Sequence, residues 1–231
     1  MELILVEENK HHNVMKSVLQ TFFSITETNE LIETLNLDLA DESELYSINF
    51  ENEIIGFIIL SPINEINNPL INLISIEDIY VKINHQNNEI AQMIALEIKK
   101  LSTNYSVDQS ELIISQSNKW LSNSLSDVGF ICSEVKLEKF LPKSNNLNDV
   151  LELLKVCTPL NRIVQVMMEK EDEYATDFIS TSNEIQPLIK LGWVPIMILV
   201  TYEPEKQNID ETIEKSNQLL HWDDYSIVYY G

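Results

Sequence analysis

The chain has 231 residues, 44% of them hydrophobic, which is enough for a packed core in one large domain or in one domain with a substantial extension. Fifteen Lys and Arg stand against 37 Asp and Glu, so the formal net charge is −22. Nucleic acid and membranes are excluded as expected partners, because anionic surfaces are bound by clusters of Lys and Arg. The acidity either attracts a basic protein or an amine, or serves only solubility.

No apolar run approaches the roughly 18 residues of a membrane span, and the start of the chain lacks a basic region before a long apolar one. A cytoplasmic location is therefore expected. The two cysteines, Cys132 and Cys157, lie far apart without a C-x-x-C spacing. Neither a disulfide framework nor a metal site is predicted from them, and the oligomeric state is left open.

The first part of the chain predicts a strand followed by two helices. Residues 2–7 (ELILVE) are typical of a strand. A helix is expected from about residue 9, because apolar residues then recur at helical spacing. Residues 26–35 predict a second, short helix with Thr28 as its N-cap.

The stretch from residue 73 to residue 101 is central to the organisation of the chain. β-Branched and aromatic residues over 74–81 predict a strand. A helix is expected after a polar turn, because apolar residues follow at spacings of four, four and three on one face. These residues are Ile90, Ile94, Ile98 and Leu101. A strand that leads into a helix N-terminus places unpaired backbone N–H groups where an anionic ligand can bind.

Further strands and helices are expected on both sides of this stretch. Residues 46–50 and 54–60 predict a hairpin around Glu51 and Asn52. Residues 111–115 predict a strand, and Gly129-Phe130 begins another that runs to residue 141. Pro142 and the polar stretch after it mark the expected boundary between domains of residues 1–142 and 143–231.

Residues 143–231 predict a second α/β run. Its helices are expected at 147–156, 182–191 and 209–220, and its strands at 162–168, 194–202 and 225–230. Gly192-Trp193 follows a helical stretch as Gly129-Phe130 does. This similarity indicates either a truncated second copy of the first domain's core or a generic helix–Gly–strand unit. The spacing from the asparagine to the glycine is shorter in the second segment, which favours the generic unit.

In order and spacing, residues 44–141 resemble the core of the GNAT-type N-acetyltransferases. The segment ELYSINFENEIIGFIIL resembles the family's strand, tight turn and strand. Val81 stands five residues before Gln86, as the family's strand valine stands before its Gln/Arg-x-x-Gly-x-Gly/Ala loop. Asn118 stands eleven residues before Gly129-Phe130, as in the family's Asn-to-Gly-Phe helix. The resemblance implies an α/β fold with a mixed, mostly antiparallel central sheet flanked by helices.

The resemblance also implies a reaction, the transfer of an acyl group such as acetyl from acyl-CoA to an amine on a small molecule or a protein. A carboxylate on the central strand would accept the proton of the amine, and Glu77 and Asp78 are the candidates. Strand alternation is expected to place them on opposite faces, with Glu77 preferred. The expected acyl-CoA-binding residues are Ile79, Val81, Gln86, Asn87, Asn88, Glu89, Ile90, Ala91 and Asn118.

Two positions depart from the family's pattern. In the loop QNNEIA, Glu89 takes the place of the central glycine. It adds a negative charge where two phosphates would bind, and like charges about 4 Å apart cost about 1–4 kcal/mol at dielectric constants of about 80 to 20. The same residue also suits the first turn of a helix. Where many members carry a tyrosine that protonates the departing thiolate, this chain has Leu125.

Two functions follow from these observations. The first is an active acyl-CoA-dependent transferase, which predicts that Glu89 turns outward and that CoA stabilises the fold. The second is a catalytically inactive GNAT-fold protein that binds a partner through its acidic surface, which predicts no binding of acyl-CoA. A small-molecule sensor that uses a remodelled site is a third option.

Overall fold

The structure is a computed structural model that describes most of the chain. The described residues are 1–39, 43–64, 72–104, 109–141, 150–153, 163–170, 175–179, 182–202, 213–214 and 221–231. They divide into two compact units, residues 1–131 with 228–231, and residues 132–227. Residues 142–149, where the domain boundary was expected, lie outside the described residues, so that boundary stays a prediction.

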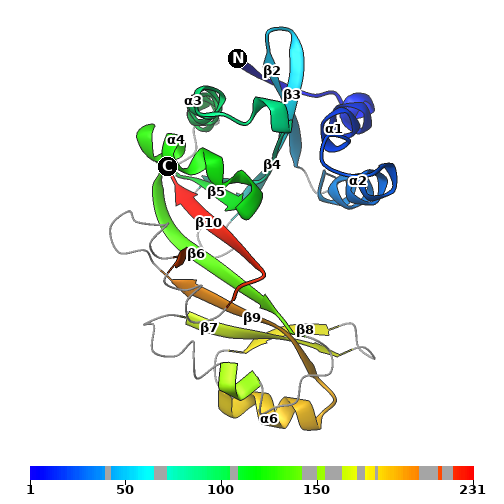
Figure 1. Ribbon diagram of the computed structural model, residues 1–231, viewed down its shortest axis with the longest axis vertical. Coiled ribbons are helices and arrows are strands. Elements are labelled where there is room, and N and C mark those ends of the chain that lie inside the picture. The colour runs from blue at the N-terminus through cyan, green and yellow to red at the C-terminus, as the bar shows by residue number, and fades with distance from the viewer. Residues whose placement is uncertain are drawn as a thin grey trace. The chain divides into compact units, whose positions relative to one another are not determined.

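The first unit is built on a sheet with the strand order β1-β2-β3-β4-β5, and the last residues of β10 lie beside β5 (Figure 1). β1 to β4 pair antiparallel, whereas β4 and β5 pair in parallel. The predicted α/β fold with a mixed, mostly antiparallel sheet is therefore confirmed. The strands are β1 (Glu2–Leu5), β2 (Glu44–Phe50), β3 (Glu53–Asn64), β4 (Asn72–Val81), β5 (Gln109–Ser115) and β10 (Asp224–Tyr230).

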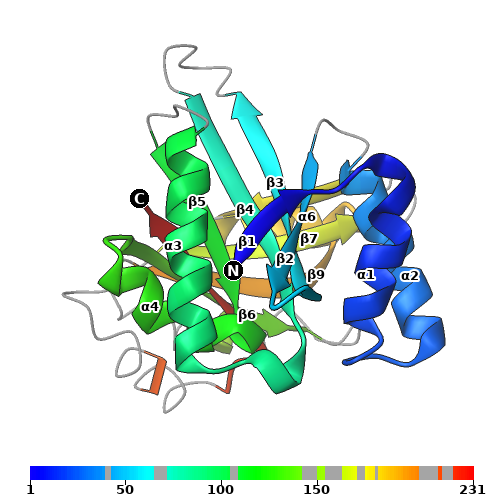
Figure 2. The same ribbon diagram turned by 90° about the horizontal axis from the view of Figure 1, so that it is seen from above.

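Helices cover both faces of this sheet. α1 and α2 lie on one face of β2, β3 and β4, and α3 lies on the other (Figures 1 and 2). The α-helices are α1 (His11–Leu19), α2 (Ile25–Leu39), α3 (Asn88–Asn104) and α4 (Ser122–Asp127). Short 3-10 helices are η1 (Glu8–Lys10), η2 (Ile83–His85) and η3 (Gln116–Leu121).

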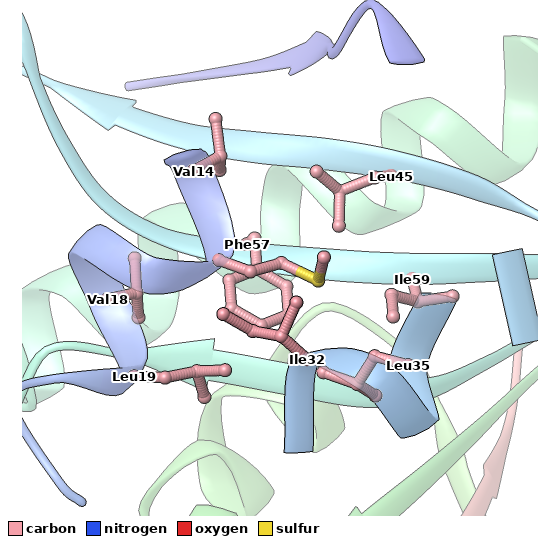
Figure 3. Close-up of a cluster of buried hydrophobic side chains, with 9 residues drawn as sticks. Val14, Val18, Leu19, Ile32, Leu35, Leu45, Phe57 and Ile59 are labelled. Carbon is pink, nitrogen blue, oxygen red and sulfur yellow. The ribbon is translucent and has the colours of Figure 1, made fainter. Parts of the chain in front are cut away.

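Each face of the sheet has an apolar core. The four apolar residues of the expected α3 face are all buried. On the other face, α1 and α2 pack against β2 and β3, and Figure 3 shows these side chains gathered around the ring of Phe57. The cluster consists of Val14, Met15, Val18, Leu19, Ile32, Leu35, Leu45, Phe57 and Ile59.

Local turn chemistry explains two ends of elements. Glu51 and Asn52 have φ angles of 50° and 67°, which a two-residue hairpin of type I′ requires, so the predicted hairpin is confirmed. The predicted N-cap at Thr28 is wrong, because Thr28 is buried within α2. Ser24 caps the helix instead: its amide donates to Glu27 Oε2 at 2.9 Å, and the Glu27 amide donates to Ser24 Oγ at 3.4 Å.

The second unit contains antiparallel strands in the order β6-β9-β7-β8. They are β6 (Ile131–Phe140), β7 (Ile163–Lys170), β8 (Ala175–Ile179) and β9 (Val194–Tyr202), and α6 (Ser182–Lys190) precedes β9. β8 was not predicted from the sequence. The helices expected at 147–156 and 209–220 fall largely outside the described residues.

α4 and α6 end in the same way. Gly129 and Gly192 have φ angles of +100° and +92°. The next residue donates its amide back to the helix in each case, from Phe130 to the Leu125 carbonyl at 3.0 Å and from Trp193 to the Leu188 carbonyl at 3.1 Å. This is a general helix C-terminal motif. The similarity between the two segments therefore does not by itself distinguish a truncated second core from a generic helix–Gly–strand unit.

Candidate functional site

β4 is irregular at the position of the predicted general base. Ile59 of β3 pairs with Asp78, but the next residue, Leu60, pairs with Ile76, so Glu77 is an extra residue in β4. Such a bulge interrupts the alternation of side chains and changes their direction. The side chain of Glu77 lies outside the described part of the structure. Its role as a base stays a prediction, and so does its placement on the face opposite Asp78.

The pairing between β4 and β5 ends next to this bulge. Parallel pairs cover four positions and end at Ile76 opposite Leu112, although the strands continue to Val81 and Ser115. Within residues 72–81 and 109–115, all described, β4 therefore has no strand partner from β5 after Ile76. A strand edge without a partner presents backbone N–H and C=O groups to which an extended ligand can add.

The neighbouring hydrogen bonds show which backbone groups face this edge. The Lys82 amide donates to the Ile55 carbonyl of β3 at 2.8 Å, so Lys82 faces β3. In an antiparallel pair the direction of the backbone groups alternates from one residue to the next. Val81 and Ile79 therefore direct their N–H and C=O groups away from β3, toward the side of β5.

Both of these carbonyl groups accept hydrogen bonds from side-chain amides. Asn118, in η3 just after β5, donates through Nδ2 to the Ile79 carbonyl at 2.6 Å, and this bond is buried. Gln86, in the loop before α3, donates through Nε2 to the Val81 carbonyl at 2.8 Å. The structure thus brings together four of the predicted cofactor-binding residues, which are separated by up to 39 positions in the sequence.

The N-terminus of α3 lies directly after this loop. Asn87 accepts the Ile90 amide on its Oδ1 at 3.1 Å and the Ala91 amide on its carbonyl oxygen at 2.9 Å. The amides of Asn88 and Glu89 donate to no other described residue, so these two remain for an anion. The side chain of Glu89 is exposed to solvent in the first turn. The predicted loop residues therefore gather at one helix start, with a negative charge at its surface.

Asp78 is held by a tyrosine that the sequence analysis did not identify. The Tyr80 hydroxyl is hydrogen-bonded to Asp78, and the Tyr80 ring stacks on Phe57. Burial, followed by the negative charge of Asp78 and this hydrogen bond, raises the pKa of Tyr80 to about 12. Tyr80 thus stays protonated at neutral pH. Its position two residues after a carboxylate, on the same strand, is the signal that could have found it.

The position expected for the acid is apolar in the structure as well. Leu125 is completely buried in α4. Three residues before it, the Ser122 carbonyl accepts a hydrogen bond of 3.5 Å from the hydroxyl of Tyr229 on β10. Two buried donors of this segment, Trp120 Nε1 and Ser122 Oγ, have no hydrogen-bond partner among the described residues. The segment after β5 therefore contains a hydroxyl group, on Ser122, and an indole N–H, on Trp120. Neither residue was singled out from the sequence.

Among the described residues, no group of three or more His, Cys, Asp or Glu side chains is arranged to hold a metal ion. No helix in this part of the chain is long and apolar enough to cross a membrane. Burial raises the pKa of the Cys132 thiol to about 11, so this cysteine is protonated at neutral pH.

No family model matches the sequence, and comparison with curated proteins gives no match either. Solved structures do match. An acetyltransferase of the GNAT family from Desulfovibrio desulfuricans is 10% identical with a TM-score of 0.41, over 87% of this chain and 97% of that one. A Bacillus subtilis acetyltransferase in complex with CoA is 11% identical with a TM-score of 0.40, over 88% and 99%.

A third match is ribosomal-protein-alanine N-acetyltransferase from Brucella melitensis, 16% identical with a TM-score of 0.41, over 55% of this chain and 91% of that one. At such identities and TM-scores the likeness carries no conclusion about activity. The GNAT-like order of elements stands on this chain's own strands: an antiparallel hairpin, a bulged β4, and a parallel β5 reached through α3.

Proposed function

We propose that this chain binds acyl-CoA along the edge of β4 and transfers the acyl group to an amine. The observation that carries the proposal is the geometry of β4. A bulge at Glu77 lies where the pairing with β5 ends, and the strand then runs on to the start of α3. The edge at Ile79 and Val81 suits an extended arm with amide groups, and the amides of Asn88 and Glu89 suit one phosphate oxygen or two.

In the proposed reaction, Glu77 is the group that takes up the proton of the amine. The amine nitrogen forms a bond to the acyl carbon, the carbon–sulfur bond breaks, and its electron pair leaves with the CoA sulfur as a thiolate. A carboxylate contributes to such a step when it lies within hydrogen-bond reach of the amine, directly or through one water. Leu125 donates no proton, so the departing thiolate takes its proton from water.

The charge of the chain, which includes exposed carboxylates on α2, would favour a cationic acceptor. Glu27, Glu30 and Glu33 are exposed on α2, and α2 contains no Lys or Arg. With a chain charge of −22, a protonated amine is drawn to the protein and an anionic acceptor is repelled. The proposed substrate class is therefore an amine on a small molecule or on a protein.

Binding is tested by thermal unfolding with acetyl-CoA and with longer acyl-CoAs. A ligand at one hundred times its dissociation constant adds about 2.7 kcal/mol to the free energy of unfolding, which raises the melting temperature measurably. We expect Glu89→Gly and Glu89→Gln to increase the shift, because both remove a negative charge from the helix start. Glu97→Gln, farther along the same helix, is the control and should leave the shift unchanged.

Transfer is tested by the release of free CoA thiol from acetyl-CoA in the presence of a panel of amines. We expect Glu77→Gln to lower the rate at a saturating concentration of acetyl-CoA and to leave the binding of acetyl-CoA unchanged. Asp78→Asn is the matched variant on the next position of β4. A rate that falls with Asp78→Asn and not with Glu77→Gln would move the base to Asp78, and a wild-type protein that binds no acyl-CoA would refute the proposal.

A second function has its own supporting observations. Leu125 fills the expected acid position with a buried aliphatic side chain, and side-chain amides already bond the carbonyl groups at the β4 edge. Both suit a catalytically inactive protein that binds a basic protein partner through its acidic surface. This function predicts no thermal shift with any acyl-CoA, together with binding of a polylysine peptide that salt abolishes. Polyglutamate is the control peptide.

A further inference from the structure

The backbone groups of the proposed acyl-CoA site are already bonded within the chain by three side-chain carboxamides. Asn118 bonds the Ile79 carbonyl and Gln86 bonds the Val81 carbonyl. Asn87 bonds one of the first amides of α3. These three side chains come from two segments on either side of α3, and they act on the strand edge and on the helix start that an acyl-CoA would use.

The two bonds to β4 imitate the contacts of a neighbouring strand. Carbonyls at Ile79 and Val81 are two residues apart, which is the spacing at which a strand edge accepts N–H groups from its partner. Each carboxamide N–H takes the place of one backbone N–H. The bond from Asn118 is short, at 2.6 Å, and buried, so the edge is closed most firmly at Ile79. Gln86 is only half-buried and closes the edge at Val81 with a 2.8 Å bond.

We propose that Asn118 and Gln86 form a displaceable cap on the edge of β4, which an extended, amide-bearing ligand must replace in order to bind. The inference rests on the proposed function, since the ligand is the amide-bearing arm of acyl-CoA. An N–H of the arm then donates to the carbonyl from which a cap amide has moved away. The cap keeps a buried carbonyl satisfied in the free protein, and it lowers the affinity for the ligand by the cost of this exchange.

The cap predicts that removing Asn118 or Gln86 tightens ligand binding, whereas a role in contacting the ligand predicts weaker binding. A typical hydrogen bond contributes about 0.5–1.5 kcal/mol net, and 1.4 kcal/mol is tenfold in affinity. Removing one cap amide should therefore tighten binding by about threefold to tenfold, and removing both by up to about a hundredfold. If Asn118 and Gln86 instead contact the bound ligand, their removal weakens binding.

The experiment measures dissociation constants by calorimetry for acetyl-CoA and for pantetheine. Pantetheine carries the amides without the phosphates, so it reports on the β4 edge and not on the start of α3. The variants are Asn118→Ala, Gln86→Ala and the double variant. Gln116→Ala and Asn123→Ala, alone and together, are matched controls, because these exposed carboxamides of η3 and α4 do not bond β4. Asn118→Leu keeps the approximate shape of the side chain and removes the N–H donors without adding a charge, in case Asn118→Ala folds poorly.

We expect tighter binding of both ligands by the cap variants and no change in the controls. In amide-detected NMR spectra, the side-chain NH₂ signals of Asn118 and Gln86 should be protected from exchange in the free protein and should shift when pantetheine binds. Binding by the double variant with none by wild type would refute the proposed function for the native chain and support the cap. If wild type binds and the cap variants bind equally well or more weakly, the cap is overturned and the proposed function stands. No binding by any variant would overturn both.

Discussion

The ring of Tyr80 stacks on the ring of Phe57, with 5.0 Å between the ring centroids and 30° between the ring planes. Phe57 is completely buried in the core between the sheet and the helices α1 and α2. The hydroxyl of Tyr80 extends from this stack to Asp78. The core therefore fixes the position of a half-buried carboxylate beside the bulge of β4.

The first prediction concerns the ionisation of Tyr80. Its pKa is raised to about 12 in the folded protein, against about 10 in an unfolded chain. The neutral hydroxyl is favoured by folding, so its contribution to stability is complete below pH 10 and is lost as the pH rises from 10 toward 12. In Tyr80→Phe, the free energy of unfolding should fall less steeply over this range. Absorbance at the tyrosinate band, compared between wild type and variant, should show one tyrosine that titrates near pH 12; titration near pH 10 would contradict the assignment.

The second prediction concerns Gly56, which lies where β3 passes close to β4. A Cβ atom at this position would meet the Tyr80 carbonyl oxygen at 2.3 Å and Ile48 Cδ1 at 3.0 Å. Because the nearest atom belongs to the backbone, the strands must move apart. We expect Gly56→Ala to lower the free energy of unfolding by about 1–3 kcal/mol. Urea denaturation measures the change, with Asn123→Ala at an exposed position of α4 as the control, and an unchanged midpoint would argue against the close approach.

The third prediction concerns the expected acid position. Leu125 is fully buried, so a tyrosine placed there has to displace its neighbours and does not extend freely into a site. Leu125→Tyr should lower the free energy of unfolding by about 1–3 kcal/mol and should not restore a general acid. Asn123→Tyr adds the same ring at an exposed position of α4 and should be nearly neutral. A stable Leu125→Tyr protein with faster release of CoA thiol would contradict this expectation.

The fourth prediction concerns the start of α2. Ser24 and Glu27 bond each other's backbone amides, and the two bonds from Ser24 lower the pKa of Glu27. Ser24→Ala should cost about 0.5–2 kcal/mol at pH 7. Because the folded pKa of Glu27 lies below its ordinary value, its bond is complete above that value and is lost as the pH falls. The difference between wild type and Ser24→Ala in chemical denaturation should therefore be smaller at pH 3 than at pH 7. Thr26→Ala is the neighbouring control.

The sequence by itself determined the elements whose signals are local. The spacing of Ile90, Ile94 and Ile98 predicted a helix with one buried face, and all three are buried. The hairpin was predicted around Glu51 and Asn52, and both have positive φ, which Asn tolerates better than Glu. The α/β fold with a mixed, mostly antiparallel sheet was implied by the resemblance of residues 44–141 to the GNAT core, and the strand pairings confirm it.

Only the tertiary structure decided how the edge of β4 is used. The bulge at Glu77 depends on the register with β3, and the capping of Ile79 by Asn118 joins positions 39 residues apart. Strand register and the direction of a side-chain amide are set by how distant segments pack, and no local pattern encodes either. The resemblance named Gln86 and Asn118 as cofactor-binding residues, and that role stays a prediction. The packing decided that their side-chain amides bond the strand itself.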